Sequence, residues 1–166
     1  MLKVCRSINQ LDFRQLMDIY EEMNENTGRD RYPKQPKNLQ ILFAEQDFYQ
    51  YLEMFFRFPG AQYALWVQDG QYKAALRMED HDDGLLITAL EVPPASRGKG
   101  YATELLRAVQ DYIGHSDKRP LYSHIEKQNA ASLAVHKKCG FSVILQYAHF
   151  LDGTKHDDHN TLMWRI

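Results

Sequence analysis

Two successive hairpins constrain the fold of this 166-residue chain more than any other feature of its sequence. Residues 62–78, QYALWVQDGQYKAALRM, contain two alternating runs around Asp69-Gly70, which is a strong signal for a tight β-turn. A second turn sequence, EDHDDG at residues 79–84, leads into the apolar run LLITALEV. We therefore expect a meander of three antiparallel strands.

Helical and strand-like segments alternate around this meander, so we expect a mixed α/β fold in a single domain spanning residues 1–166. The segment NENTGRDRYPKQPKN is rich in turn formers and charge, and we expect it to be a loop. The other expected elements are strands at residues 2–8, 121–127, 141–150 and 159–166, and helices at residues 11–23, 39–58, 100–113 and 130–138.

Composition limits the classes of function. A formal net charge of −2 lacks the basic excess of nucleic-acid-binding proteins, so any anion site must be local. No apolar run approaches the roughly 18 residues that would suggest a membrane span. Two cysteines are too few for a disulfide framework, and MLKVCRSINQ has no signal-peptide core. We therefore expect a cytoplasmic protein with reduced thiols, no nucleic-acid partner and no membrane partner.

The stretch ALEVPPASRGKGYATELL, residues 89–106, joins a strand to a helix through two glycines. Glycines let a backbone approach a ligand closely, and the first turn of a helix offers unpaired N–H groups at the positive end of its dipole. That combination suits a phosphate. The pattern is neither a P-loop nor a dinucleotide fingerprint, and by itself it also fits a flexible basic turn.

A second segment, EKQNAASLAVHKKCGF, places Asn129 at the end of a strand and His136 within the following helix. Asn129, Leu133 and His136 are spaced by four and then three residues, so they share one helical face. On its own, His136 is more typical of a packed or solvated residue than of a catalyst.

Together the two segments resemble the GNAT superfamily of acyl-CoA-dependent N-acetyltransferases. Arg97-Gly98-Lys99-Gly100-Tyr101-Ala102 matches the family motif Arg/Gln-x-x-Gly-x-Gly/Ala, and residues 129–141 are similar to its second motif, an Asn opening a helix that ends in Gly-Phe. The resemblance covers residues 85–141. It implies a central, mostly antiparallel, twisted sheet of about six or seven strands flanked by about four helices, with strands splayed at an acetyl-CoA cleft.

The resemblance also implies roles for particular residues. The backbone near Glu91 would bind the pantetheine arm, the glycine loop would wrap the pyrophosphate, and Asn129 would meet the pantetheine. The implied cofactor-binding residues are Leu90, Glu91, Val92, Arg97, Gly98, Lys99, Gly100, Tyr101, Ala102, Thr103 and Asn129.

The implied reaction is direct attack of a neutral primary amine on acetyl-CoA, with no metal required. A strand amide such as that of Val92 would stabilise the oxyanion. His136 would protonate the leaving thiolate, because its ordinary pKa of ~6.5 lies near operating pH. Relatives often carry a base at positions matching Leu86 or Thr88, and neither residue is an efficient base. We assign no base, and Glu79, Asp80 or a water chain remain open.

The acceptor is less constrained. Glu22 and Glu25 lie where related folds overhang the acceptor, so we expect a small cationic amine as substrate, although both acids also fit a solvated helix face. Oligomeric state is open between a monomer and a homodimer. The run HDDH at residues 156–159 has metal-binding residue types, but its loop setting is typical of a solvated turn. The alternative function is a non-catalytic acyl-CoA-binding regulatory module, which the missing strand base keeps open.

Overall fold

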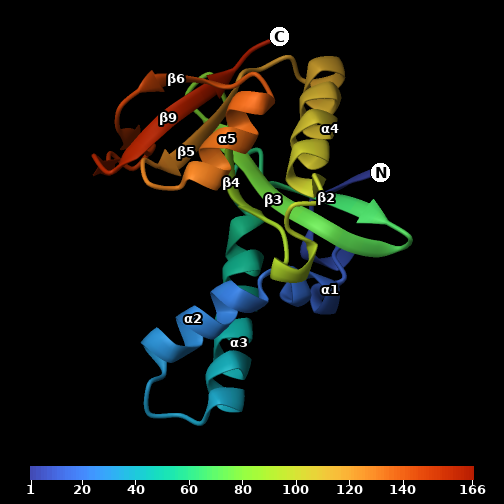
Figure 1. The fold of residues 1–166 in the computed structure, drawn as a ribbon, viewed down its shortest axis with the longest axis vertical. Coiled ribbons are helices and arrows are strands. Elements are labelled where there is room, and N and C mark those ends of the chain that lie inside the picture. The colour runs from blue at the N-terminus through green and yellow to red at the C-terminus, as the bar shows by residue number, and fades with distance from the viewer.

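The computed structural model describes all residues from 1 to 166 and contains a seven-stranded sheet in the order β1-β2-β3-β4-β5-β9-β6, with a separate two-stranded ribbon, β7-β8 (Figure 1). The strands are β1 Leu2–Cys5, β2 Gln62–Gln68, β3 Gln71–His81, β4 Gly84–Glu91, β5 Leu121–Glu126, β6 Ser142–Leu145, β7 Ala148–His149, β8 Lys155–His156 and β9 His159–Trp164. The helices are α1 Phe13–Ile19, α2 Glu21–Arg31, α3 Lys37–Phe55, α4 Tyr101–Ser116 and α5 Ala130–Lys138.

The pairing confirms the expected meander. Both hairpins form, with Gln68 opposite Gln71 and His81 opposite Gly84. Every neighbouring pair of strands is antiparallel except β4 and β5. These two pair only between residues 85–87 and 121–123 and then separate. The mostly antiparallel, splayed sheet predicted from the sequence is therefore present.

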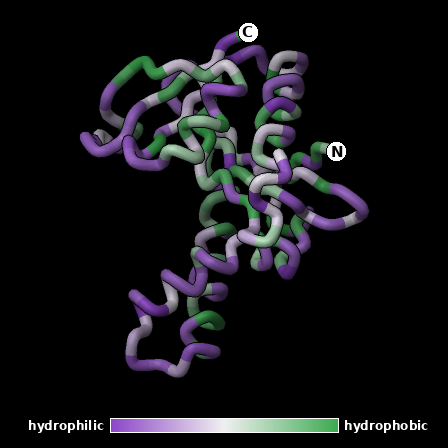
Figure 2. Tube along the Cα trace, viewed as in Figure 1, coloured by the Kyte–Doolittle hydropathy of each residue, from purple (hydrophilic) through white to green (hydrophobic).

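Two apolar clusters form the core. One lies beneath α4, whose buried residues Leu105, Leu106, Val109 and Ile113 recur at helical spacing. The other joins α1 and α3 to β2 and β3. Figure 2 shows apolar segments concentrated in the strands, while the outer parts of α2 and α3 are largely hydrophilic. The sheet thus carries helices on both faces. No helix is long and apolar enough to cross a bilayer.

The prediction of a loop over residues 24–38 is wrong, because residues 24–31 belong to helix α2. Tertiary contacts override the turn-forming composition. Gly28 lies where α2 meets α3, and a Cβ there would stand 2.5 Å from the backbone oxygen of Gln40, so the glycine allows close packing. Arg31 and Tyr32 also bind Asp47 of α3, at 2.8 and 2.7 Å. The chain consequently has five α-helices rather than about four.

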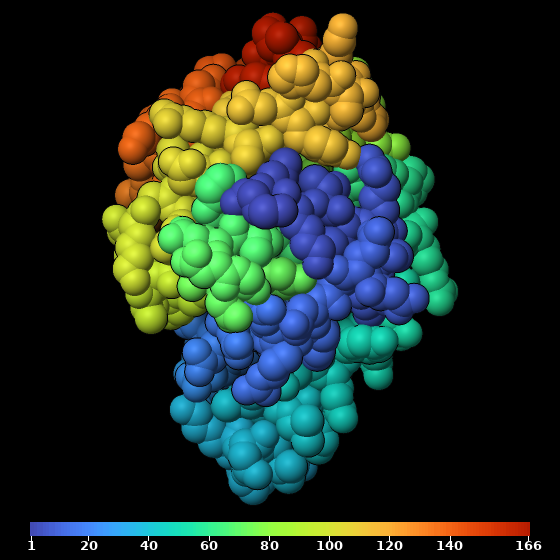
Figure 3. All heavy atoms as spheres, turned by 90° about the vertical axis from the view of Figure 1, so that its right-hand side faces the viewer, coloured from blue at the N-terminus to red at the C-terminus, as the bar shows by residue number.

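The α2-α3 hairpin projects from the sheet and forms the narrow end of the molecule (Figures 1 and 3). Only the start of α2 lies near the ends of the central strands, where Glu22 pairs with Arg97. The outer part of the hairpin is held by its own ion pairs, including Lys37 with Glu25 at 3.1 Å. The two acids expected to face an acceptor therefore have different surroundings.

Candidate active site

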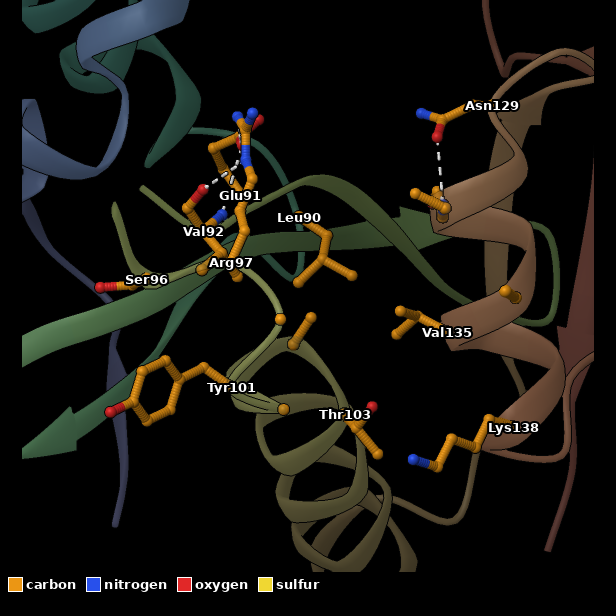
Figure 4. A pocket seen from close by; sticks show the side chains of 16 residues that line it. Leu90, Glu91, Val92, Ser96, Arg97, Tyr101, Thr103, Asn129, Val135 and Lys138 are labelled. Carbon is orange, nitrogen blue, oxygen red and sulfur yellow. Dashed lines mark hydrogen bonds and ion pairs between the residues drawn. The ribbon is translucent and has the colours of Figure 1, made fainter. Parts of the chain in front are cut away.

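A cavity of about 630 Å³ lies where β4 and β5 separate, between the end of β4, the start of α4 and one face of α5. Figure 4 shows Leu90 from β4 and Val135 from α5 pointing toward one another across it. The residues expected to bind a cofactor that do line this cavity are Leu90, Glu91, Val92, Arg97, Gly98, Gly100, Tyr101, Ala102, Thr103 and Asn129.

The glycine loop forms an open cradle of backbone amides. Gly98 and Gly100 have φ angles of 76° and 86°, in the left-handed region that favours glycine. A Cβ at either residue would meet nothing within 4 Å. Gly100 caps α4 without a side-chain hydrogen bond, so the first-turn amides have neither an intrahelical nor a side-chain partner. Such amides and the helix dipole attract an anion.

The two basic side chains of this loop point elsewhere. The Arg97 guanidinium pairs with Glu22 and with Glu91, the latter at 3.1 Å, and its Nε donates to the Val92 carbonyl at 3.2 Å. Figure 4 shows Arg97 running alongside Glu91 and Val92. Lys99 donates to the Ala95 carbonyl at 3.1 Å and does not line the cavity. The cradle is thus built from backbone groups rather than from these two cations.

Lys138 is a lining residue that the sequence analysis missed. It extends from the last turn of α5 toward the start of α4, on the side of the cavity where Thr103 lies (Figure 4). Ala131, Val135 and Lys138 are spaced by four and then three residues, so periodicity alone predicts that they share a face. The adjacent face, through Leu133, packs against the core beneath α4 instead. Ser96, Ser132 and Ala134 complete the lining.

His136 does not line the cavity. Its side chain is on the buried face of α5, only 1% exposed, with its ring 5.0 Å from that of Phe141. Nδ1 lies 2.9 Å from the Ser132 carbonyl, and Nε2 is buried without a partner. Burial lowers the pKa of His136, which favours the neutral ring. In the neutral form, Nδ1–H donates to the Ser132 carbonyl. Because His136 does not reach the cavity, its role as the proton donor to the thiolate stays a prediction.

One side chain connects His136 to the cavity. Ser132 lines the wall, and its Oγ lies 3.4 Å from Nδ1 of His136, at the long end of hydrogen-bond distances. Asn129 begins the helix, where its side chain accepts a hydrogen bond from the Ser132 amide at 3.1 Å. The cap therefore fixes the turn that presents Ser132.

A β-bulge shapes the β4 wall. Ala75 pairs with Glu91 whereas Arg77 pairs with Thr88, so β4 carries an extra residue between these pairs. Within it, Ala89 has a φ of 50°, which is unfavourable for a residue with a Cβ. The Ala89 carbonyl accepts a hydrogen bond from the Tyr20 hydroxyl at 2.8 Å, and Tyr20 in turn accepts one from Tyr63 at 2.9 Å. The bulge turns residues 90–92 toward the cavity.

The candidate bases Glu79 and Asp80 and the HDDH segment differ in their contacts. Asp80 accepts a hydrogen bond from Arg119 at 2.9 Å. Glu79 forms no ion pair, and burial raises the pKa of its carboxyl. In the HDDH segment His156 is exposed, and Nδ1 of His159 lies 2.7 Å from Asp158.

A sequence model described as the acetyltransferase (GNAT) family matches residues 14–141. An L-methionine sulfoximine/L-methionine sulfone acetyltransferase from Salmonella typhimurium is 40% identical over 55 residues, 33% of this chain and 32% of the relative. The match thus spans about a third of that relative's length.

Solved structures share the fold across the whole chain. The ribosomal-protein-S18-alanine N-acetyltransferase from Escherichia coli aligns with a TM-score of 0.63 at 18% identity, covering 100% of this chain and 94% of that one. A PaiA N-acetyltransferase from Thermoplasma acidophilum, solved in complex with coenzyme A, aligns with a TM-score of 0.62 at 12% identity, covering 100% and 99%. At such identities the likeness shows the fold alone.

Proposed function

We propose, because the chain belongs to the acetyltransferase (GNAT) family, that it transfers the acetyl group of acetyl-CoA to a primary amine. The observation that carries the proposal is the cavity at the β4-β5 splay, which joins a helix N-terminus without a side-chain cap to the end of a bulged strand. An anionic, elongated ligand suits that combination. As part of the proposal, the two free, buried cysteines are consistent with a cytoplasmic enzyme.

We assign the pyrophosphate to the amides of residues 98–103. Lys138 supplies a positive charge beside them, whereas Arg97 is neutralised by Glu22 and Glu91. The peptide groups of residues 90–92, beyond the end of the β4-β5 pairing, hold the pantetheine arm, and Asn129 borders it from α5. Arg97 then has a structural role: it links the glycine loop to β4 and α2 rather than binding phosphate.

Acetyl-CoA supplies the thioester that the amine attacks. The Val92 amide, now 3.3 Å from the Glu91 carboxylate, donates to the carbonyl oxygen as negative charge develops there. The Ser132 hydroxyl gives its proton to the departing sulfur, and its oxygen recovers, through solvent, the proton that the attacking nitrogen loses. His136 stays neutral, and its Nδ1–H, 3.4 Å from Oγ, orients the Ser132 side chain and stabilises negative charge on that oxygen. In this scheme His136 acts through Ser132, which reconciles its expected role with its buried position.

We propose a small cationic amine as the acceptor. Its support is the charge between the start of α2 and the end of β4, where the two carboxylates of Glu22 and Glu91 outnumber the single Arg97 guanidinium between them. The Glu22 side chain is 55% exposed despite this contact, so it can attract a cation from solution. Glu25 contributes less, because Lys37 already pairs with it.

One observation favours a second acceptor class, the α-amino acids. Arg77 lies over the ring of Tyr51 at 4.6 Å, forms no ion pair, and has a buried Nε without a hydrogen-bond partner. Arg77 is half-buried, and a substrate carboxylate would supply the partner that its Nε lacks. The partial match to an acetyltransferase named for methionine derivatives agrees with this class.

The test is thiol release from acetyl-CoA with a panel of amines, each paired with its α-carboxylated analogue. Turnover with at least one primary amine supports the enzyme, and tight CoA binding without turnover across the panel supports the regulatory module. Lys138→Ala should raise KM for acetyl-CoA, whereas Lys137→Ala, the adjacent lysine outside the cavity, should not. Arg77→Lys should raise KM for amino acids only.

A further inference from the structure

Three histidines meet at a point outside the cavity. His81 ends β3, His124 lies in β5 and His149 ends β7. Their ring centroids are 5.2 Å apart for His81 and His124, 5.0 Å for His81 and His149, and 6.1 Å for His124 and His149. Each ring offers a nitrogen within 4.8 Å of those of the other two. Strands far apart in the sequence thus converge on one cluster of imidazoles.

The cluster is separate from the cavity. In β5, Ile125 packs into the core beneath α4, and strand alternation directs the preceding side chain, His124, to the opposite face. None of the three histidines lines the cavity. The histidine cluster is therefore independent of the proposed acetyl transfer.

These rings lack the partners that buried polar groups normally have. Nε2 of His81, both nitrogens of His124 and Nδ1 of His149 are buried without a hydrogen bond, and His81 is only 2% exposed. Nearly all buried polar atoms in native proteins are satisfied, so several orphans in one place call for an explanation. A ligand that accepts nitrogen lone pairs would satisfy several of them together.

A carboxylate completes the set of donors. Oδ2 of Asp82 lies 2.8 Å from Nε2 of His149 and 3.6 Å from Nε2 of His81. Asp82 is exposed, in the turn between β3 and β4. Three imidazoles and one carboxylate form a donor set typical of Zn²⁺ and its first-row neighbours, whereas Mg²⁺ and Ca²⁺ prefer oxygen alone.

The protonation state of the cluster suits a metal. Burial lowers the pKa of His81, and burial together with the neighbouring imidazoles lowers that of His124 to about 4. Both rings are consequently neutral at pH 7. A metal needs this form, because only an unprotonated nitrogen has a lone pair to share.

We propose that His81, His124, His149 and Asp82 bind one divalent transition-metal ion of the Zn²⁺ type. Tetrahedral Zn²⁺ at ~2.0–2.1 Å from nitrogen places its ligands about 3.4 Å apart, so the side chains rotate inward on binding. Asp82, in an exposed turn, and His149, at the end of a two-residue strand, supply most of that movement. Four protein ligands leave no open position. The ion clamps the β7-β8 ribbon to the β3-β4 turn and is structural.

The test titrates the chelator-treated, full-length chain with Zn²⁺ by calorimetry and with Co²⁺ as a spectroscopic probe of geometry. We expect one ion per chain, the absorption of tetrahedral Co²⁺, and a higher Tm in Zn²⁺. Removing a ligand in His149→Gln should weaken Zn²⁺ binding by about 100-fold or more, since even outer-shell partners are worth 10–100-fold. Asp82→Asn should also weaken binding while keeping the shape of the side chain.

The second group of potential ligands in the chain provides the control. His156, Asp158 and His159 also lie within ligand reach of one another, but His156 and Asp158 are exposed. The double variant His156→Gln with His159→Gln should keep wild-type Zn²⁺ affinity and stoichiometry. Absence of Zn²⁺ binding by the wild-type chain overturns the proposal. So does binding that His149→Gln preserves, or that the control variant alone abolishes.

Discussion

The hydroxyl of Tyr20 holds the bulge that turns β4 toward the cavity, and Tyr20→Phe tests this role. Tyr20 donates to the Ala89 carbonyl and accepts from Tyr63. Burial raises the pKa of Tyr20 to about 12, so it remains a neutral donor at any working pH. The variant leaves two groups unpaired: a partly buried carbonyl and a buried hydroxyl. At roughly 1–3 kcal/mol for each unsatisfied group, the free energy of unfolding should fall by about 2–6 kcal/mol.

Tyr63→Phe is the matched control, because it removes one hydroxyl of the same pair but leaves the bond from Tyr20 to Ala89 intact. It should cost only about 1 kcal/mol, the net worth of one hydrogen bond. Urea unfolding measures both values, and the double variant should cost less than their sum because the residues share a bond. Tyr20→Phe should also raise KM for acetyl-CoA, whereas Tyr63→Phe should not. Equal costs for the two single variants would refute the argument that Tyr20 supports the bulge.

Four further predictions concern the cavity and its surroundings. Gly100→Val should weaken CoA binding, measured by calorimetry, with a smaller effect on Tm. Gly100 has a φ of 86°, which a β-branched residue adopts only with strain, so the backbone of the amide cradle should shift. Unchanged affinity contradicts the pyrophosphate assignment. His136→Phe and Ser132→Ala should each lower kcat by ~10²-fold with little change in KM for acetyl-CoA, and the double variant should be no slower than either single variant. If His136→Phe keeps the wild-type kcat, the His136 ring serves only in packing. Burial lowers the pKa of His136, so as pH falls this histidine is protonated in the unfolded chain before it is protonated in the folded one. The free energy of unfolding should therefore fall as pH drops below ~6.5, and should fall less in His136→Phe; urea unfolding at several pH values measures both. Glu22→Gln should raise KM for a cationic amine and flatten its salt dependence, whereas Glu25→Gln, whose carboxylate already pairs with Lys37, should change neither; equal effects remove Glu22 from the acceptor site.

The sequence predicts local features well where one short segment determines the geometry. The turn at Asp69-Gly70, the glycine junction before α4 and the helix that Asn129 opens are encoded within a few residues, and each forms as expected. The failure at α2 has the opposite cause. Its turn-forming residues are helical because Gly28 packs against Gln40, twelve positions later in the chain, and no local pattern reveals that contact.

The direction of long side chains is equally hard to predict. Arg97 looks like a phosphate ligand in the sequence because it adjoins the glycines, but two carboxylates from β4 and α2 hold its guanidinium. The histidine cluster escapes sequence analysis for a related reason. His81, His124 and His149 share no spacing motif and meet only because β3, β5 and β7 converge.

The position of Arg97 has a consequence for how the cavity attracts its ligand. With that guanidinium neutralised and Lys99 bound to the Ala95 carbonyl, Lys138 is the remaining basic side chain on the cavity wall. Anion binding then depends chiefly on backbone amides and the α4 dipole, which act over short range. A protein with a formal net charge of −2 repels a polyanion weakly at long range, so attraction must arise within the cleft itself. Substitutions that disturb the backbone of the cradle should therefore affect binding more than the loss of either loop cation.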